Sequence, residues 1–70
     1  MRVLVFRARR VSDEQNRTAQ GCIAIYRNVN TEEAWRKVCA ELGPGVYQVV
    51  VEREVAGAWR FQDAEIAQIE

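Results

Sequence analysis

The segment from Asn30 to Gly45 constrains the fold most, because it alone carries a complete helix signature. Asn30 is a favourable N-cap, and Glu33 stands three residues later, where it completes a capping box. Gly43 supplies a left-handed residue after the helix, and Pro44 prevents continuation. The residues between them recur at spacings of three and four and predict one apolar stripe: Ala34, Trp35, Val38, Cys39 and Leu42.

Apolar runs on both sides of this helix predict strands. They span Arg2–Val11, Gly21–Arg27, Val46–Glu54 and Ala58–Gln62. The stretch Ser12–Gln20 is polar and lacks periodicity, so it predicts a long mobile loop. The stretch Asp63–Glu70 favours a short helix capped by Asp63 with Ile66 and Ile69 inward, and the alternative is a continuation of the last strand.

The turn between the last two strands decides which side chains face each other. A two-residue loop, Ala56-Gly57, would place Arg53 opposite Arg60, with Glu52 beside Phe61. A three-residue loop, Val55–Gly57, would instead place Glu52 opposite Arg60 and gather Tyr47, Val49, Val51, Trp59 and Phe61 on one face. Opposite charges and a shared aromatic face both favour the three-residue loop.

The predicted order is β-β-α-β-β, an α+β class with a four-stranded sheet and one helix packed on one face. We expect a single domain over residues 1–70. The order resembles the β-grasp arrangement of ubiquitin-like and protein G-like domains. That resemblance implies that the first and last strands are central and parallel, with the helix across one sheet face.

Composition excludes several classes of function. The chain has no histidine, so a Cys/His zinc site within one copy is excluded, and no cofactor motif is present. Cys22 and Cys39 are expected to be buried free thiols, with a disulfide as the alternative. The apolar run Val3–Phe6 is too short to span a membrane or form a signal peptide. We therefore expect a cytoplasmic protein, in a cell or in an infected host, and a viral origin fits the small size.

The sequence gives little support for catalysis, so we expect that the protein is not an enzyme. Without histidine, acid–base chemistry would fall to carboxylates, cysteine or tyrosine. Glu32 and Glu33 are explained by helix capping, and Gly43-Pro44-Gly45 ends a helix where a phosphate loop would begin one.

Three of the strands are apolar on both faces, although a single helix can cover only one face of a sheet. The runs are Val3–Phe6, Ile23–Tyr26 and Val49–Val51. The second face is then covered within the chain by Ile66 and Ile69 of the C-terminal segment together with the long loop, by a second copy as a homodimer, or by a protein partner. We therefore expect a small non-catalytic interaction module, a regulator or inhibitor, that self-associates or binds a protein through a sheet face or edge. The residues predicted to bind the partner are Ile25, Val50, Tyr26 and Trp59. Charged residues at Ile25 or Val50 are expected to disturb association more than folding.

Charge is balanced overall but not along the chain. Residues 1–27 hold six arginines and two acids, a net of +4, whereas residues 28–70 hold four basic residues and eight acids, a net of −4. The basic cluster supports an alternative, a nucleic-acid-binding regulator that clamps phosphates and stacks bases on sheet aromatics. Its predicted contacts are Arg7, Arg9, Arg10 and Arg17. The alternative without a binding role is a solvated strand end whose arginines pair with acidic residues of the second half of the chain.

Overall fold

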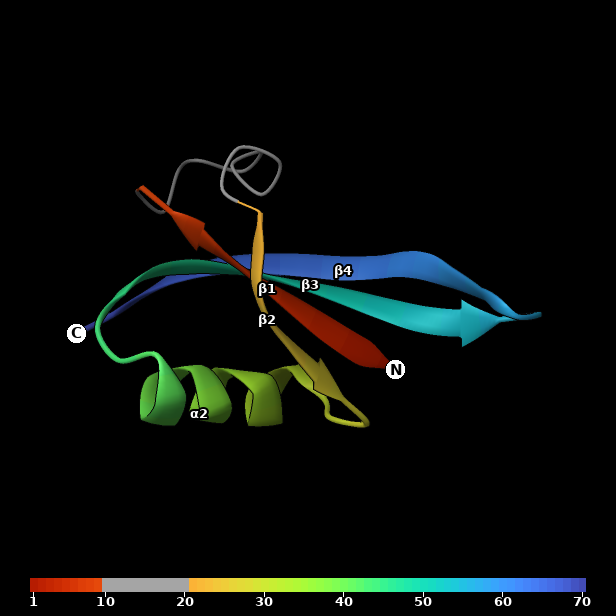
Figure 1. The fold of residues 1–70 in the computed structure, drawn as a ribbon, viewed down its shortest axis with the longest axis horizontal. Helices are drawn as coiled ribbons and strands as arrows, with labels where there is room; N and C mark the ends of the chain where they lie inside the picture. Colours follow the sequence, from red (N-terminus) through yellow and green to blue (C-terminus); the bar gives the residue numbers. More distant parts are fainter. Residues whose placement is uncertain (10–20) are drawn as a thin grey trace.

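The computed structural model describes residues 1–9 and 21–70, and it forms one antiparallel sheet with one helix on it (Figure 1). In the described part the elements follow the order β1 (Arg2–Ala8), β2 (Cys22–Arg27), α2 (Thr31–Glu41), β3 (Gly45–Val55) and β4 (Ala58–Ile69). This confirms the predicted β-β-α-β-β order and the α+β class. The predicted loop Ser12–Gln20 lies outside the described residues.

Helix α2 begins and ends where the local sequence predicts. The Asn30 side chain accepts a hydrogen bond from the Glu33 backbone N–H at 2.8 Å, and the Glu33 carboxylate accepts one from the Asn30 N–H at 3.5 Å. Both bonds satisfy N–H groups that the first turn leaves without helical partners. Gly43 follows the helix at φ +77°, the left-handed conformation that glycine adopts without strain.

The sheet order is β2-β1-β3-β4, and every neighbouring pair is antiparallel. The β-grasp expectation of central, parallel first and last strands is therefore wrong. The central strands are β1 and β3, and β4 lies at an edge. Strand β3 suits the central position because its run Val49–Val51 is apolar toward both faces. Since β1 occupies one side of β3, the hairpin places β4 on the other side.

The predicted C-terminal helix is also wrong, because β4 continues as a strand to Ile69. The second half of β4 pairs with the first half of β3, from Ala64 opposite Val50 to Ile69 opposite Gly45. A helix of that length would be marginal by itself. A strand, in contrast, supplies backbone partners to the side of β3 that β1 leaves free.

The β3–β4 turn contains two residues, so the three-residue prediction is wrong. Ala56 and Gly57 both have positive φ, +52° and +80°, as the two central residues of a type I′ turn do. The twist of this turn matches the right-handed twist of the two strands that it joins. Arg53 consequently lies opposite Arg60, and both side chains are exposed, so water screens the repulsion. The register then shifts, since Glu52 pairs with Phe61 and Val51 pairs with Asp63. Gln62 is therefore the extra residue of a bulge.

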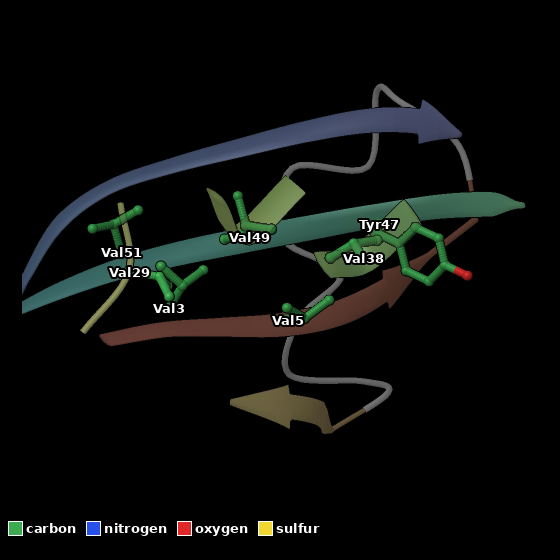
Figure 2. Packing of buried hydrophobic residues seen from close by; sticks show 8 residues of the cluster. Val3, Val5, Val29, Val38, Tyr47, Val49 and Val51 are labelled. Carbon is green, nitrogen blue, oxygen red and sulfur yellow. The ribbon is translucent and has the colours of Figure 1, made fainter. Parts of the chain in front are cut away.

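The hydrophobic core lies between α2 and the sheet (Figure 2). Ala34 and Val38 of the helix are fully buried, whereas Trp35 and Leu42 pack at its margin. The strands and the helix lead-in contribute the remaining buried residues, which are Val3, Val5, Val29, Tyr47, Val49 and Val51. The Tyr47 hydroxyl donates toward carbonyl oxygens at the end of α2, each 3.2 Å away, so the ring is buried without stranding its polar atom.

The two cysteines differ from expectation in their burial. Cys22 and Cys39 are free thiols, as predicted, but both are exposed. Cys39 lies at the border of the apolar stripe on α2. Only Ala34 and Val38 of the helix are buried, so this border of the stripe stays exposed.

Candidate functional site

The sheet face turned away from α2, which we call the far face, is lined by alternate residues of the four strands. Opposite residues in antiparallel strands share a face, so the register assigns its members. One row runs Ile25–Leu4–Val50–Ala64, and the next includes Phe6, Gln48 and Ile66. The apolar members are Leu4, Phe6, Ala8, Ile25, Val46, Val50, Trp59, Phe61, Ala64 and Ile66. In the described part of the chain, no helix or strand packs across it (Figure 1).

Exposure on the far face rises from its centre toward both edges. On the central strand β3, Val50 is 5% exposed and Gln48 is 3% exposed. At the edges, Ile25 of β2 is 46% exposed and Phe61 of β4 is 63% exposed. Exposed side chains of this size at both edges give the face two apolar flanks around a packed centre.

A polar cluster ties β1 to the hairpin on this face. Arg2 Nε donates to Glu52 Oε1 at 2.7 Å, and both side chains are 22% exposed. The Arg2 guanidinium also lies over the Trp59 ring, 4.3 Å from the ring centre, which is a favourable cation–π distance. Trp59, predicted to bind a partner, is thus half-buried and already held by Arg2. Glu52 pairs with Arg2 and not with Arg60 as the three-residue turn would require.

Tyr26 lies on the opposite side of the sheet from Ile25, Val50 and Trp59. It pairs with Val3 and packs against the core under α2. Its hydroxyl donates to Glu41 Oε1 at 3.3 Å, and Lys37 Nζ lies 5.9 Å from the ring centre. Burial raises the pKa of Tyr26 above its usual value of 10.0, and the Glu41 charge and hydrogen bond raise it further. The structure brings together the other three predicted partner-binding residues but not Tyr26.

The predicted nucleic-acid contacts are only partly described. The Arg7 guanidinium lies 5.3 Å from the centre of the Tyr47 ring, on the helix side of the sheet. Arg9 is exposed just beyond the end of β1. Arg10 and Arg17 lie outside the described residues.

The three-residue turn misplaced two far-face residues, Trp59 and Phe61. Phe61 shows why. The three-residue turn would have set it beside Val51 under the helix, whereas the observed register pairs it with Glu52 on the far face. The one local signal that could have found it is Gly57, which suits the second position of a two-residue turn, whereas Ala56 is not a residue that the first position favours. Ile23 and Val55 are also exposed, at 39% and 47%.

The outer side of β4 is the other available surface. Along the described chain, β3 is the only strand that pairs with β4. Arg60, Asp63 and Glu65 are exposed on this strand, and Trp35 Nε1 of the helix donates to Glu65 Oε1 at 2.9 Å. A charged and apolar strand edge of this kind suits strand addition by a partner.

Comparison of the chain with protein-family models, curated proteins and solved structures gives no match. The residues described here form no cluster of three or more metal-ligating side chains. The described helix is neither long enough nor apolar enough to cross a membrane.

Proposed function

We propose that this protein is a small non-catalytic interaction module, or a regulator or inhibitor, that binds a protein through the far face of its sheet. The observation that carries the proposal is the pair of exposed apolar flanks, Ile25 at 46% and Phe61 at 63% exposure, on one face. A partner that covers this face buries both flanks at once, and apolar surface buried in this way is typical of interaction sites.

The chemistry of this face fits a protein partner. Burial of apolar surface contributes about 25 cal/mol per Å², and aromatic residues are enriched at the buried centres of interfaces. Phe61 has most of its surface available for such burial. The neighbouring row, Arg27–Arg2–Glu52–Phe61, adds charged groups beside the apolar ones, as at the rim of a typical interface.

The proposal places the protein in the cytoplasm, of a cell or of an infected host. Both cysteines are exposed free thiols, a state that reducing compartments maintain. A small viral regulator is consistent with this setting. It would act by occupying a surface of its partner protein, without catalysing a reaction.

The test is affinity capture from extracts of the source cell, with wild-type protein and matched variants. Ile25→Glu and Phe61→Glu each place a charge in a flank that is already exposed, so folding is retained. Lys37→Glu changes charge on α2, away from the far face, and serves as the control. We expect one set of proteins to be retained by wild type and Lys37→Glu and lost by both flank variants. Equal retention by all four proteins would contradict the proposal.

A further inference from the structure

Strand β4 has a long side that carries no partner strand in the described chain. It contains twelve residues, whereas β2 at the other edge of the sheet contains six. An unpaired edge presents a row of backbone N–H and C=O groups to any strand that can align with it. No proline interrupts β4, so none of its backbone N–H groups is missing.

The bulge at Gln62 divides β4 into two halves whose side chains alternate in opposite phase. Before the bulge, odd-numbered Trp59 and Phe61 belong to the far face. After it, even-numbered Ala64 and Ile66 do. Since opposite residues of antiparallel strands share a face, pairing along the whole strand must set the first half of one copy against the second half of the other.

One register meets this condition on both faces of the sheet. With the twofold axis between positions 62 and 63, Trp59 lies opposite Ile66, and Phe61 lies opposite Ala64, all on the far face. On the helix side, Arg60 of each copy then lies opposite Glu65 of the other. Apolar residues meet apolar residues, and two pairs of opposite charges face each other across the axis.

Neighbouring registers lose these features. A shift that sets Phe61 opposite Ile66 places Asp63 opposite Ala64, although these two belong to different faces. A shift that sets Arg60 opposite Asp63 leaves Phe61 facing the bulged Gln62. Registers centred in the second half bring Glu65 opposite Asp63 or opposite itself, which sets like charges together.

We propose that a second copy of this chain pairs antiparallel with the free edge of β4, with Arg60 of each copy opposite Glu65 of the other. Arg60 and Glu65 are both exposed, and among the described residues neither takes part in a salt bridge. The Trp35 indole binds Glu65 Oε1, which leaves Glu65 Oε2 for the partner's arginine. Strand β4 is thus complementary to itself in charge and in side-chain face.

The dimer would be one continuous eight-stranded sheet. A twofold axis perpendicular to the sheet leaves both far faces on the same side, so Phe61 of one copy extends the apolar surface of the other. This inference goes beyond the proposed function, because it concerns the free edge of β4 and not the far face. It adds a second copy of the chain as the partner of that edge, and the register in which the two copies pair.

The experiment measures the molar mass by light scattering on a gel-filtration column, over a wide range of protein concentration. We expect the wild-type mass to rise from 8.1 kDa toward twice that value with concentration, and the dimer to weaken at high salt. Arg60→Glu and Glu65→Arg should each weaken the dimer about tenfold or more, because both charge pairs become repulsive.

An equimolar mixture of Arg60→Glu and Glu65→Arg should restore association, because every charge pair in the mixed dimer is again opposite. Two controls should dimerise like wild type. Lys37→Glu, on α2, changes the net charge by the same amount as Arg60→Glu. Trp35→Phe removes the indole hydrogen bond to Glu65 without changing the charge. Circular dichroism checks that each variant is folded.

The outcomes separate this inference from the proposed function. A wild-type monomer at every concentration, or a dimer indifferent to both charge variants, would overturn the β4 pairing. A dimer that is lost in Ile25→Glu and kept in Arg60→Glu would also overturn it, while supporting a contact through the far face. Rescue in the mixture would establish the Arg60–Glu65 register whether or not other proteins bind the far face.

Discussion

The sheet face beneath α2 and the far face are lined by alternate residues of the same strands, yet their side chains are buried to different degrees. Under the helix, Val5 and Val49 have no exposed surface. On the far face, Val50 keeps 5%, while Ile25 and Phe61 keep about half or more. Burial under α2 takes whole apolar side chains out of water, whereas the exposed flanks of the far face contribute little to folding. Substitutions on the far-face flanks can therefore change binding without unfolding the protein.

The largest contrast between the two faces should come from truncating one aromatic residue on each. Tyr47→Ala removes a fully buried ring and its hydrogen bonds to the end of α2, which should cost about 3–5 kcal/mol of unfolding free energy. Phe61→Ala should change it by less than about 0.5 kcal/mol, because Phe61 is 63% exposed. Urea denaturation measures both. Similar losses would mean that the two faces are equally part of the core.

A second contrast lies within one row of the far face. Contrary to the expectation from the sequence, a charge at Val50 should disturb folding first. Val50→Asp buries a charge at a 5% exposed position and should cost at least about 3 kcal/mol, enough to unfold a marginal domain of this size. Ile25→Asp, in the same row, should leave the fold intact because Ile25 is 46% exposed. Circular dichroism against temperature distinguishes them. Folded Val50→Asp protein would show that the centre of the far face is not part of the core.

Local signals explain which parts of this fold the sequence predicts well. The capping box at Asn30 and the left-handed Gly43 depend on residues within one helix, so they could be predicted without knowledge of the sheet. The prediction of the hairpin register depends on pairing Glu52 with Arg60. The actual partner of Glu52 is Arg2, fifty residues away, and no local pattern indicates that contact.

The same limit applies to strand order and to the candidate surface. Residues 63–69 carry too few apolar positions for their periodicity to separate helix from strand. They form a strand because one side of β3 is free to pair with them. Ile25 could be placed on an exposed face from alternation alone. Phe61 and Tyr26 could not, because their faces depend on a two-residue turn and on the side that α2 covers.

The helix cap offers a smaller test of how firmly α2 closes its face. Asn30→Ala removes the side chain that accepts from the Glu33 N–H and should cost about 1 kcal/mol. Glu33→Gln keeps a group that can reach the Asn30 N–H, so its effect should be smaller. Urea denaturation compares the two. An unchanged midpoint in Asn30→Ala would mean that packing alone fixes the start of the helix.

The smallest expected effect is a pH dependence at the margin of the covered face. The pKa of Tyr26 is raised above 10.0, first by burial and then by the charge and hydrogen bond of Glu41, so folding favours the neutral phenol. This contribution to stability is complete below pH 10.0 and is lost as pH rises through the folded pKa.

Stability of the wild type should therefore fall more steeply above pH 10.0 than that of Tyr26→Phe, which has no phenol to ionise at this position. Glu41→Gln should lower the pKa of Tyr26 toward 10.0, because it removes the nearby negative charge. Phenolate absorbance, taken as the difference between wild type and Tyr26→Phe, measures the titration of this residue. If Glu41→Gln left that titration unchanged, burial against the core alone would account for the raised pKa. The hydrogen bond between Tyr26 of β2 and Glu41 of α2 would then have no effect on the ionisation of Tyr26.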